Sequence, residues 1–256
     1  MSTPLISPGA LISQSWKAFR STWKETFNVS VWFLLPPALT IVGALLARSM
    51  PGGGLLFSIL NLIGVIIAIH TSLRLMQFVL HKDLGQSTTN ITKNILVPWK
   101  IFFSYLWIGL LLGLAVLGGT ILFVLPGIWL GIAFSMASFF LLEDGIRSTQ
   151  ALAHSMALVK GRWWGTFGRL LSAGIVFGLL VLVTAVILSF ILGLIGGFGN
   201  LSLMMGNSDL PYGMMVTENP LTLGLRLGLQ GIIQIIFAPL IIIWQVKLFH
   251  SLKDSR

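Results

Sequence analysis

One stretch of the chain carries four polar side chains at helical spacing: His70, Arg74, Gln77 and His81. Their intervals of four, three and four residues place them along one face of a helix. A guanidinium beside imidazole groups can bind an anion such as a phosphate. The two histidines are too far apart to share a metal ion, because eleven residues correspond to about 16 Å along a helix axis. No metal site is therefore expected here.

A second polar group combines two adjacent carboxylates, Glu143 and Asp144, with His154 further along the chain. Paired carboxylates can act as acid and base or bind a cation. They can equally be structural, because anions are favoured at a helix N-terminus and a new helix is expected to begin near Ser148 and Thr149. We favour helix capping and keep a polar site as the alternative.

Motifs that carry enzymatic chemistry are missing from the chain. It has no cysteine, no phosphate-binding loop, no HExxH zinc motif and no GxSxG nucleophile motif. We therefore expect neither an enzyme nor a bound cofactor or metal. An enzyme that acts on lipid headgroups through Glu143, Asp144 and His154 is the least favoured of three functional hypotheses.

The composition indicates which elements must position these residues. Of the 256 residues, 55% are hydrophobic and only 9% are charged, and the mean hydropathy is +0.94. Such values are typical of a chain whose solvent is a lipid bilayer. The net charge of +9 does not indicate a nucleic-acid partner, because the basic residues lie between apolar segments rather than on one soluble domain.

Several apolar segments are long enough to cross a bilayer, which takes about 20 residues of helix. We place six spans near residues 28–47, 55–79, 102–124, 127–142, 168–196 and 223–248. Leu125-Pro126-Gly127 predicts the turn between the third span and the short fourth one. Because no long polar linker interrupts them, residues 1–256 are predicted to form one all-α, polytopic integral membrane domain.

The distribution of lysine and arginine predicts the orientation of the chain. Fourteen of these sixteen residues fall on one side of the six spans, and only Arg48 and Arg226 fall on the other. Basic residues are enriched on the cytoplasmic side of membrane proteins, so both termini are predicted to be cytoplasmic. Residues 1–26 are polar enough to form an amphipathic helix that lies at the interface.

Tryptophan next to a basic residue recurs at three junctions between a mildly amphipathic segment and an apolar span. The junctions contain Trp23 and Lys24, Trp99 and Lys100, and Arg162 followed by Trp163 and Trp164. Tryptophan prefers the level of the lipid headgroups, where lysine and arginine can reach phosphate. The pattern predicts a threefold repeat of an interfacial helix plus a hairpin. The alternative is that three helices are anchored independently.

Four short runs carry a resemblance to a known family: 125–130 (LPGIWL), 139–145 (FFLLEDG), 151–155 (ALAHS) and 159–164 (VKGRWW). Together they resemble the membrane domain fused to some bacterial and archaeal glycerophosphodiester phosphodiesterases, and uncharacterised YciC-like membrane proteins. The resemblance covers about residues 120–172. It implies a multispanning helical domain without an assigned reaction, in a prokaryotic plasma membrane. The soluble enzymatic barrel of the fused proteins does not fit in this chain.

Anionic lipid is the favoured ligand of the basic residues. Arg74 is predicted to form a headgroup pocket with Lys160 or Arg162, because an arginine inside a span is normally paired or faces a polar cavity. Its alternative role is to snorkel to the interface. The predicted lipid or anion contacts are His70, Arg74, Lys160, Arg162, Trp163, Trp164, Trp99, Lys100, Trp23 and Lys24.

Two non-enzymatic functions are compatible with these residues. The favoured one is a membrane protein that interacts with anionic lipid or organises protein partners, whose identity the sequence does not indicate. The second is a transporter or export component for a lipid or small hydrophobic solute. That function predicts a polar cavity beside Asn61, His70, Gln230 and Gln234. Alternatively, these polar groups form hydrogen bonds between packed helices.

Overall fold

The computed structural model describes residues 5–88, 91, 96–196 and 219–255. All regular structure in these ranges is helical, and no strand occurs in them. Six of the helical segments are long and apolar enough to cross a membrane. The prediction of an all-α polytopic membrane protein with six spans is therefore confirmed.

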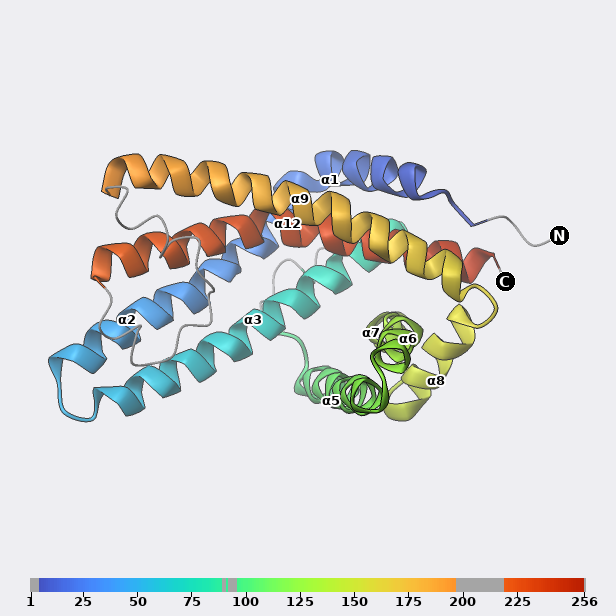
Figure 1. The fold of residues 1–256 in the computed structure, drawn as a ribbon, viewed down its shortest axis with the longest axis horizontal. Coiled ribbons are helices and arrows are strands. Elements are labelled where there is room, and N and C mark those ends of the chain that lie inside the picture. Colours follow the sequence, from blue (N-terminus) through green and yellow to red (C-terminus); the bar gives the residue numbers. More distant parts are fainter. Residues whose placement is uncertain (1–4, 89–90, 92–95, 197–218, 256) are drawn as a thin grey trace. The chain divides into compact units, whose positions relative to one another are not determined.

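The first two spans are connected by a short turn (Figure 1). The chain begins with α1 (Pro8–Ser30), a single 3-10 turn η1 (Val31–Leu34), α2 (Leu35–Ser49) and α3 (Gly53–Asp83). Pro36 and Pro37 occupy the first turn of α2, where a missing backbone N–H removes no helical hydrogen bond. Gly52 reverses the chain after α2 with a φ of 77°, a left-handed conformation that glycine adopts without strain.

The middle of the chain forms four helices. They are α5 (Trp99–Leu122), α6 (Val124–Phe134), α7 (Ala137–Glu143) and α8 (Ser148–Val159). The hairpin between α5 and α6 turns at the single extended residue Phe123, not at Leu125-Pro126-Gly127 as the sequence predicted. Pro126 and Gly127 lie instead in the first turn of α6, where a proline is tolerated because its N–H would have no helical partner.

Glycine allows α5 and α6 to lie side by side (Figure 1). A Cβ atom added to Gly127 would lie 2.1 Å from Thr120 Oγ1, and one added to Gly119 would lie 2.9 Å from the Gly127 backbone nitrogen. The tip of this hairpin is wholly apolar and exposed, with exposed fractions from 63% at Val124 to 84% at Ile121. No charged residue occurs between Lys100 and Glu143.

Two long helices complete the described chain: α9 (Trp163–Gly196) and α12 (Pro220–Asp254). The Gly- and Met-rich segment that precedes α12 lies largely outside the described residues. Trp99 and Trp163 each begin a helix, as the repeat predicts, whereas Trp23 lies inside α1. The interfacial helix expected before Trp99 falls partly on residues 89–90 and 92–95, which also lie outside the described residues.

The chain divides into two compact units. Unit 1 contains residues 1–23, 73–175 and 240–256, and unit 2 contains residues 24–72 and 176–239. The core of unit 1 includes Phe139 stacked on Phe249, with ring centroids 5.4 Å apart. The core of unit 2 includes Ala44, Phe57, Leu223 and Leu227. Because α3, α9 and α12 contain residues of both units, this division does not test the prediction of one membrane domain.

Candidate functional site

Unit 1 contains a network of ion pairs, here called the ionic cluster, at the ends of α3, α7 and α12. Lys247 Nζ lies 3.1 Å from Asp83 Oδ1, and Lys253 Nζ lies 2.6 Å from Glu143 Oε1 and 3.0 Å from the carboxylate oxygens of Asp144. The members of the ionic cluster are Asp83, Glu143, Asp144, Lys247, His250 and Lys253.

His250 lies at the centre of the ionic cluster and contacts two carboxylates. Its Nδ1 lies 2.7 Å from Asp83 Oδ2, and its Nε2 lies 2.8 Å from Glu143 Oε2. An ionised carboxylate can only accept hydrogen bonds, so both ring nitrogens must donate. The geometry is that of a protonated imidazole, which brings the ionic cluster to three positive and three negative charges.

The structure differs from the capping interpretation of Glu143 and Asp144. The residue that precedes α8 at its N-cap is Arg147, and no side chain caps this helix. Both carboxylates are bonded to α12 instead. His154 does not join them, and its ring packs 5.6 Å from that of Phe140. The alternative interpretation, a polar site, describes these carboxylates better.

The basic residues of the ionic cluster were not predicted as site residues from the sequence. Lys247, His250 and Lys253 follow one another at intervals of three residues, which brings them to one face of α12. This spacing was a visible signal. Their acidic partners precede them by about a hundred residues or more, so the pairing itself depends on tertiary structure.

Arg74, the first predicted anion contact, is buried and held by the protein. It is 8% exposed, and its Nη2 donates a hydrogen bond to the backbone carbonyl of Leu96, just before α5. Its Nε is buried without a hydrogen-bond partner among the described residues. Arg74 thus holds the segment before α5 through this hydrogen bond. Its contact with a lipid stays a prediction.

The other predicted pocket residues bind different segments. Arg162 donates hydrogen bonds to Ser255 and to the carbonyl of Leu252, near the end of α12, and Lys160 is exposed. The hydrogen bonds of Arg74 and Arg162 thus go to separate segments, and none joins Arg74 to Lys160 or Arg162. A headgroup pocket built from these three side chains therefore stays a prediction.

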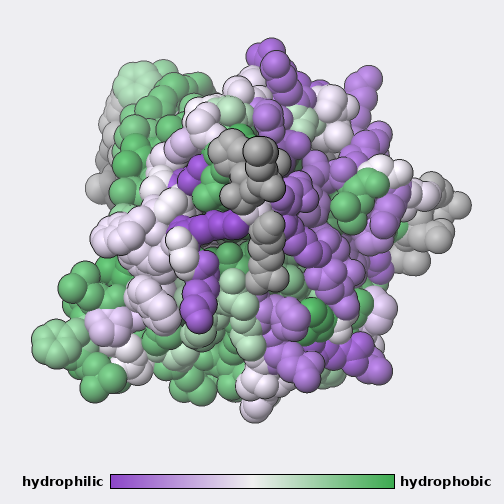
Figure 2. Space-filling model, turned by 90° about the vertical axis from the view of Figure 1, so that its right-hand side faces the viewer, coloured by the Kyte–Doolittle hydropathy of each residue, from purple (hydrophilic) through white to green (hydrophobic). Residues whose placement is uncertain are grey.

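The tryptophan and lysine junctions are largely exposed, as membrane anchors require. Trp23, Trp99 and Trp164 are all exposed, and so are Lys24 and Lys100. Trp163 is half-buried and stacks on Phe167. His70 is fully buried in unit 2. Hydrophilic residues cover much of the face seen in Figure 2, with hydrophobic residues along its left and lower edges.

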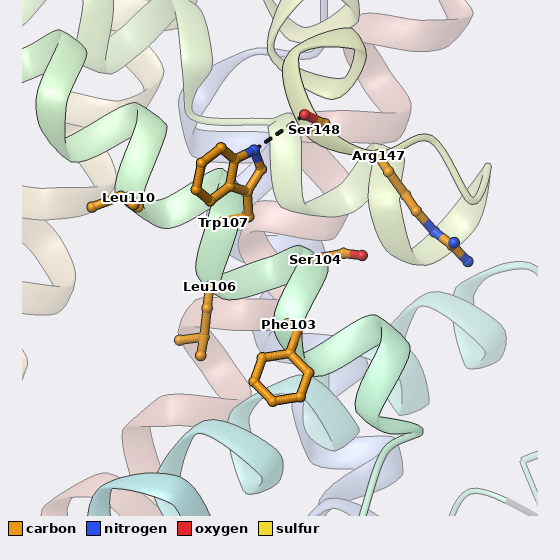
Figure 3. Close-up of a pocket in the computed structure, with 7 residues that line it drawn as sticks. All are labelled: Phe103, Ser104, Leu106, Trp107, Leu110, Arg147 and Ser148. Atoms are coloured by element: carbon orange, nitrogen blue, oxygen red, sulfur yellow. Dashed lines mark hydrogen bonds between the residues drawn. The ribbon is translucent and has the colours of Figure 1, made fainter.

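A groove in unit 1, here called the α5–α8 groove, combines an apolar wall with one cation. It has a volume of about 570 Å³. Its lining residues are Phe103, Ser104, Leu106, Trp107 and Leu110 of α5, with Arg147 and Ser148 at the start of α8 (Figure 3). The indole Nε1 of Trp107 donates a 3.2 Å hydrogen bond to Ser148 Oγ, which joins the two walls.

The turn that presents Arg147 to the α5–α8 groove is strained. Ser148 adopts a φ of 56°, which costs a residue other than glycine about 1 kcal/mol. Arg147 is exposed and forms no ion pair with any described residue. Its side chain extends away from the Trp107 ring (Figure 3). Arg147 could not be selected from the sequence, because the groove depends on how α8 packs on α5.

Unit 2 contains a polar recess between α2, α3 and α12, here called the amide recess. Its volume is about 290 Å³. Asn61, Gln230 and Gln234 line it, as the transport hypothesis predicted, whereas His70 does not. Thr40 and the prolines Pro36 and Pro37 line it as well.

The chain was compared with protein-family models, with curated proteins and with solved structures, and nothing matches it. The functional argument therefore depends on the residues of this chain. The resemblance to the membrane domain of glycerophosphodiester phosphodiesterases stays a prediction about architecture.

Proposed function

We propose that this integral membrane protein binds anionic lipid at the α5–α8 groove and catalyses no reaction. The observation that carries the proposal is Arg147, an exposed cation beside an apolar groove, with no acidic partner among the described residues. An anionic amphiphile matches both features, because its phosphate can meet the guanidinium while its acyl chain covers the apolar wall.

The groove has polar groups that suit the phosphate of such a lipid and apolar groups that suit its acyl chain. The hydroxyl group of Ser148 lies on the groove lining with Arg147, accepts the hydrogen bond from Trp107 and can donate its own proton to a phosphate oxygen. Phe103 and Leu110 offer exposed apolar surface to an acyl chain. One basic residue near a membrane surface contributes about 1 kcal/mol of attraction to anionic lipid.

The ionic cluster supports the proposal through charge balance. It ties Asp83, Glu143 and Asp144 to bases of α12, so these acids do not offset the basic residues on the surface. Among the described residues, seven basic side chains are exposed: Lys17, Arg20, Lys24, Lys82, Lys100, Arg147 and Lys160. They favour an anionic bilayer surface. The distribution of the basic residues along the sequence is the reason for proposing that both termini are cytoplasmic, and the family resemblance is the reason for proposing a prokaryotic plasma membrane.

Native mass spectrometry tests the proposal. Protein in mild detergent is mixed with equal amounts of phosphatidylglycerol and phosphatidylcholine, and retention of the anionic lipid is expected to dominate. Arg147→Gln is expected to lower that retention about fivefold, which corresponds to about 1 kcal/mol.

The matched control is Lys17→Gln, which removes one exposed positive charge from α1 and leaves the groove intact. It is expected to change retention by less than about twofold, because Lys17 does not line the groove and salt weakens the attraction of an exposed charge. Equal losses in the two variants would contradict a specific groove, and no loss in either would contradict the proposal as a whole.

Passage of a lipid or small hydrophobic solute is a second candidate function, which the amide recess favours. Transporters place polar binding groups near the bilayer midplane, often beside helices interrupted by proline. In unit 2 the polar groups of Asn61 and Gln230 lie beside Pro36 and Pro37. A scrambling assay with fluorescent phosphatidylcholine in proteoliposomes tests this function, and a rate no higher than that of protein-free vesicles would exclude lipid passage.

A further inference from the structure

The amide recess lies inside the apolar part of the fold. Gln230 and Gln234 lie 7 and 11 residues inside the expected span 223–248, and Asn61 lies 6 residues inside the expected span 55–79. With the helical rise, these positions are about 9 to 16 Å from the start of each span. A ligand at this depth reaches the recess from the hydrocarbon phase.

Close helix contacts shape the recess around two glycines. A Cβ atom added to Gly64 would lie 3.3 Å from the Pro36 Cα, and one added to Gly231 would lie 2.9 Å from the Leu34 Cδ2 and 3.4 Å from the Pro37 Cγ. The missing side chains let α3 and α12 approach the proline turn of α2. The proline rings cannot change φ, so this side of the recess is rigid.

The hydrogen-bonding groups of α2 and α3 are only partly satisfied. Thr40 Oγ1 lies 2.9 Å from Asn61 Oδ1 and 3.1 Å from the Pro36 carbonyl oxygen. A hydroxyl has a single proton, so it can serve only one of these acceptors at a time. Asn61 Nδ2 donates to the Phe57 carbonyl. The Asn61 amide nitrogen carries two protons, so its second donor has no partner among the described residues.

The side-chain amides of Gln230 and Gln234 are open as well. They lie one turn apart on α12, where Gln230 is half-buried and Gln234 is exposed, and neither forms a hydrogen bond with a described residue. Each amide offers two donors and one acceptor oxygen. An amide left without partners in an apolar medium costs about 2 to 7 kcal/mol, so a hydrogen-bonding occupant is expected. Because none of the described residues that line the recess is charged, the occupant need carry no charge.

We propose that the amide recess binds an uncharged amphiphile whose hydroxyl or carbonyl groups bond to Gln230 and Gln234. Ligand pockets measure about 300 to 1,000 Å³, so the recess holds the polar part of such a molecule and leaves its hydrocarbon part among the apolar helices. Leu227, Val65 and Ala68 extend the apolar lining. A neutral glycerolipid with a free hydroxyl, such as a diacylglycerol, has this chemistry.

The proposal is distinct from anionic lipid binding at the α5–α8 groove. A second copy of the chain is a different occupant, because glutamine on membrane helices can also bond between chains. The recess is a pocket lined by residues of three helices, and this form favours a small ligand over a helix of another copy.

Photoaffinity labelling tests the proposal on the full chain in phosphatidylcholine nanodiscs. The probe is a diacylglycerol with a diazirine near its glycerol. Labelling is expected in peptides of α2, α3 or α12 that line the recess, and the double variant Gln230→Leu/Gln234→Leu is expected to reduce it about tenfold, the change that about 1.4 kcal/mol produces.

Gln245→Leu is the matched control, because Gln245 lies on the same helix and outside the recess. It is expected to leave labelling unchanged, as is Arg147→Gln, which separates this proposal from the groove. Thr40→Val gives a milder change at the same recess should the double variant not fold. Equal labelling in the double variant and the control would overturn the proposal. It would also be overturned if the double variant dissociated a dimer without loss of labelling.

Discussion

The ionic cluster and the amide recess differ in how far their polar groups are paired within the protein. In the ionic cluster, three acids and three bases satisfy one another at the ends of helices. In the amide recess, Gln230 and Gln234 have no partner among the described residues. Polarity alone therefore does not mark a binding site in such a fold. The informative quantity is how much hydrogen-bonding capacity the protein leaves open.

Stability measurements give the largest expected contrast between the two regions. Glu143→Gln removes one of the two carboxylate partners of both His250 and Lys253 in a half-buried site, and we expect a loss of about 1 to 3 kcal/mol in the free energy of unfolding. Gln230→Leu/Gln234→Leu removes amides that bond to nothing in the described chain, so we expect no loss or a small gain. Thermal unfolding in detergent measures both.

A comparison within the ionic cluster sharpens this result. Asp144 contacts only Lys253 and is more exposed than Glu143, so Asp144→Asn is expected to cost less than about 1 kcal/mol. If Glu143→Gln and Gln230→Leu/Gln234→Leu lowered the free energy of unfolding equally, the ionic cluster and the amide recess would not differ in how far their polar groups are satisfied.

Salt separates the two proposed lipid sites by a smaller effect. Retention of phosphatidylglycerol at the α5–α8 groove depends on a charge and is expected to fall several-fold when the ionic strength rises from about 0.1 to 1 M, because the Debye length shortens from about 10 to 3 Å. Labelling of the amide recess by the neutral probe is expected to stay constant. A salt-dependent loss of labelling would indicate that the recess binds a charged molecule.

The smallest expected effect concerns the wall of the groove. Trp107→Phe keeps an aromatic ring but removes the hydrogen bond to Ser148, and we expect about 0.5 to 1.5 kcal/mol of lost stability. Because this bond helps to hold the strained turn beside Arg147, retention of phosphatidylglycerol should fall as well. Thermal unfolding measures the loss of stability, and native mass spectrometry measures the retention of the lipid.

Spans could be predicted from the sequence because hydropathy over about 20 residues is a local property. All six expected segments coincide with long apolar helices. The position of the turn between α5 and α6 was wrong by a few residues, because Pro126 is compatible with the first turn of a helix as well as with a loop. Trp23 likewise gave no signal that α1 would continue past it.

Sites were harder to predict, because their members come from distant segments. The polar residues of the amide recess were visible as interruptions of apolar spans, and three of the four predicted ones line it. The ionic cluster required the pairing of Asp83 with Lys247, and nothing local in the sequence indicates that contact. Arg147 was inconspicuous for the same reason.

The uncharged hairpin of α5 and α6 has a consequence for how the protein is made. No charged residue lies between Lys100 and Glu143, and exposed apolar side chains surround the turn of the hairpin at Phe123. Moving a charged side chain through hydrocarbon costs about 2.5 to 3.5 kcal/mol on insertion scales, and this segment avoids that cost entirely. During biogenesis, α5 and α6 can therefore enter the bilayer together from one side, as a preformed pair, without a charged loop to translocate.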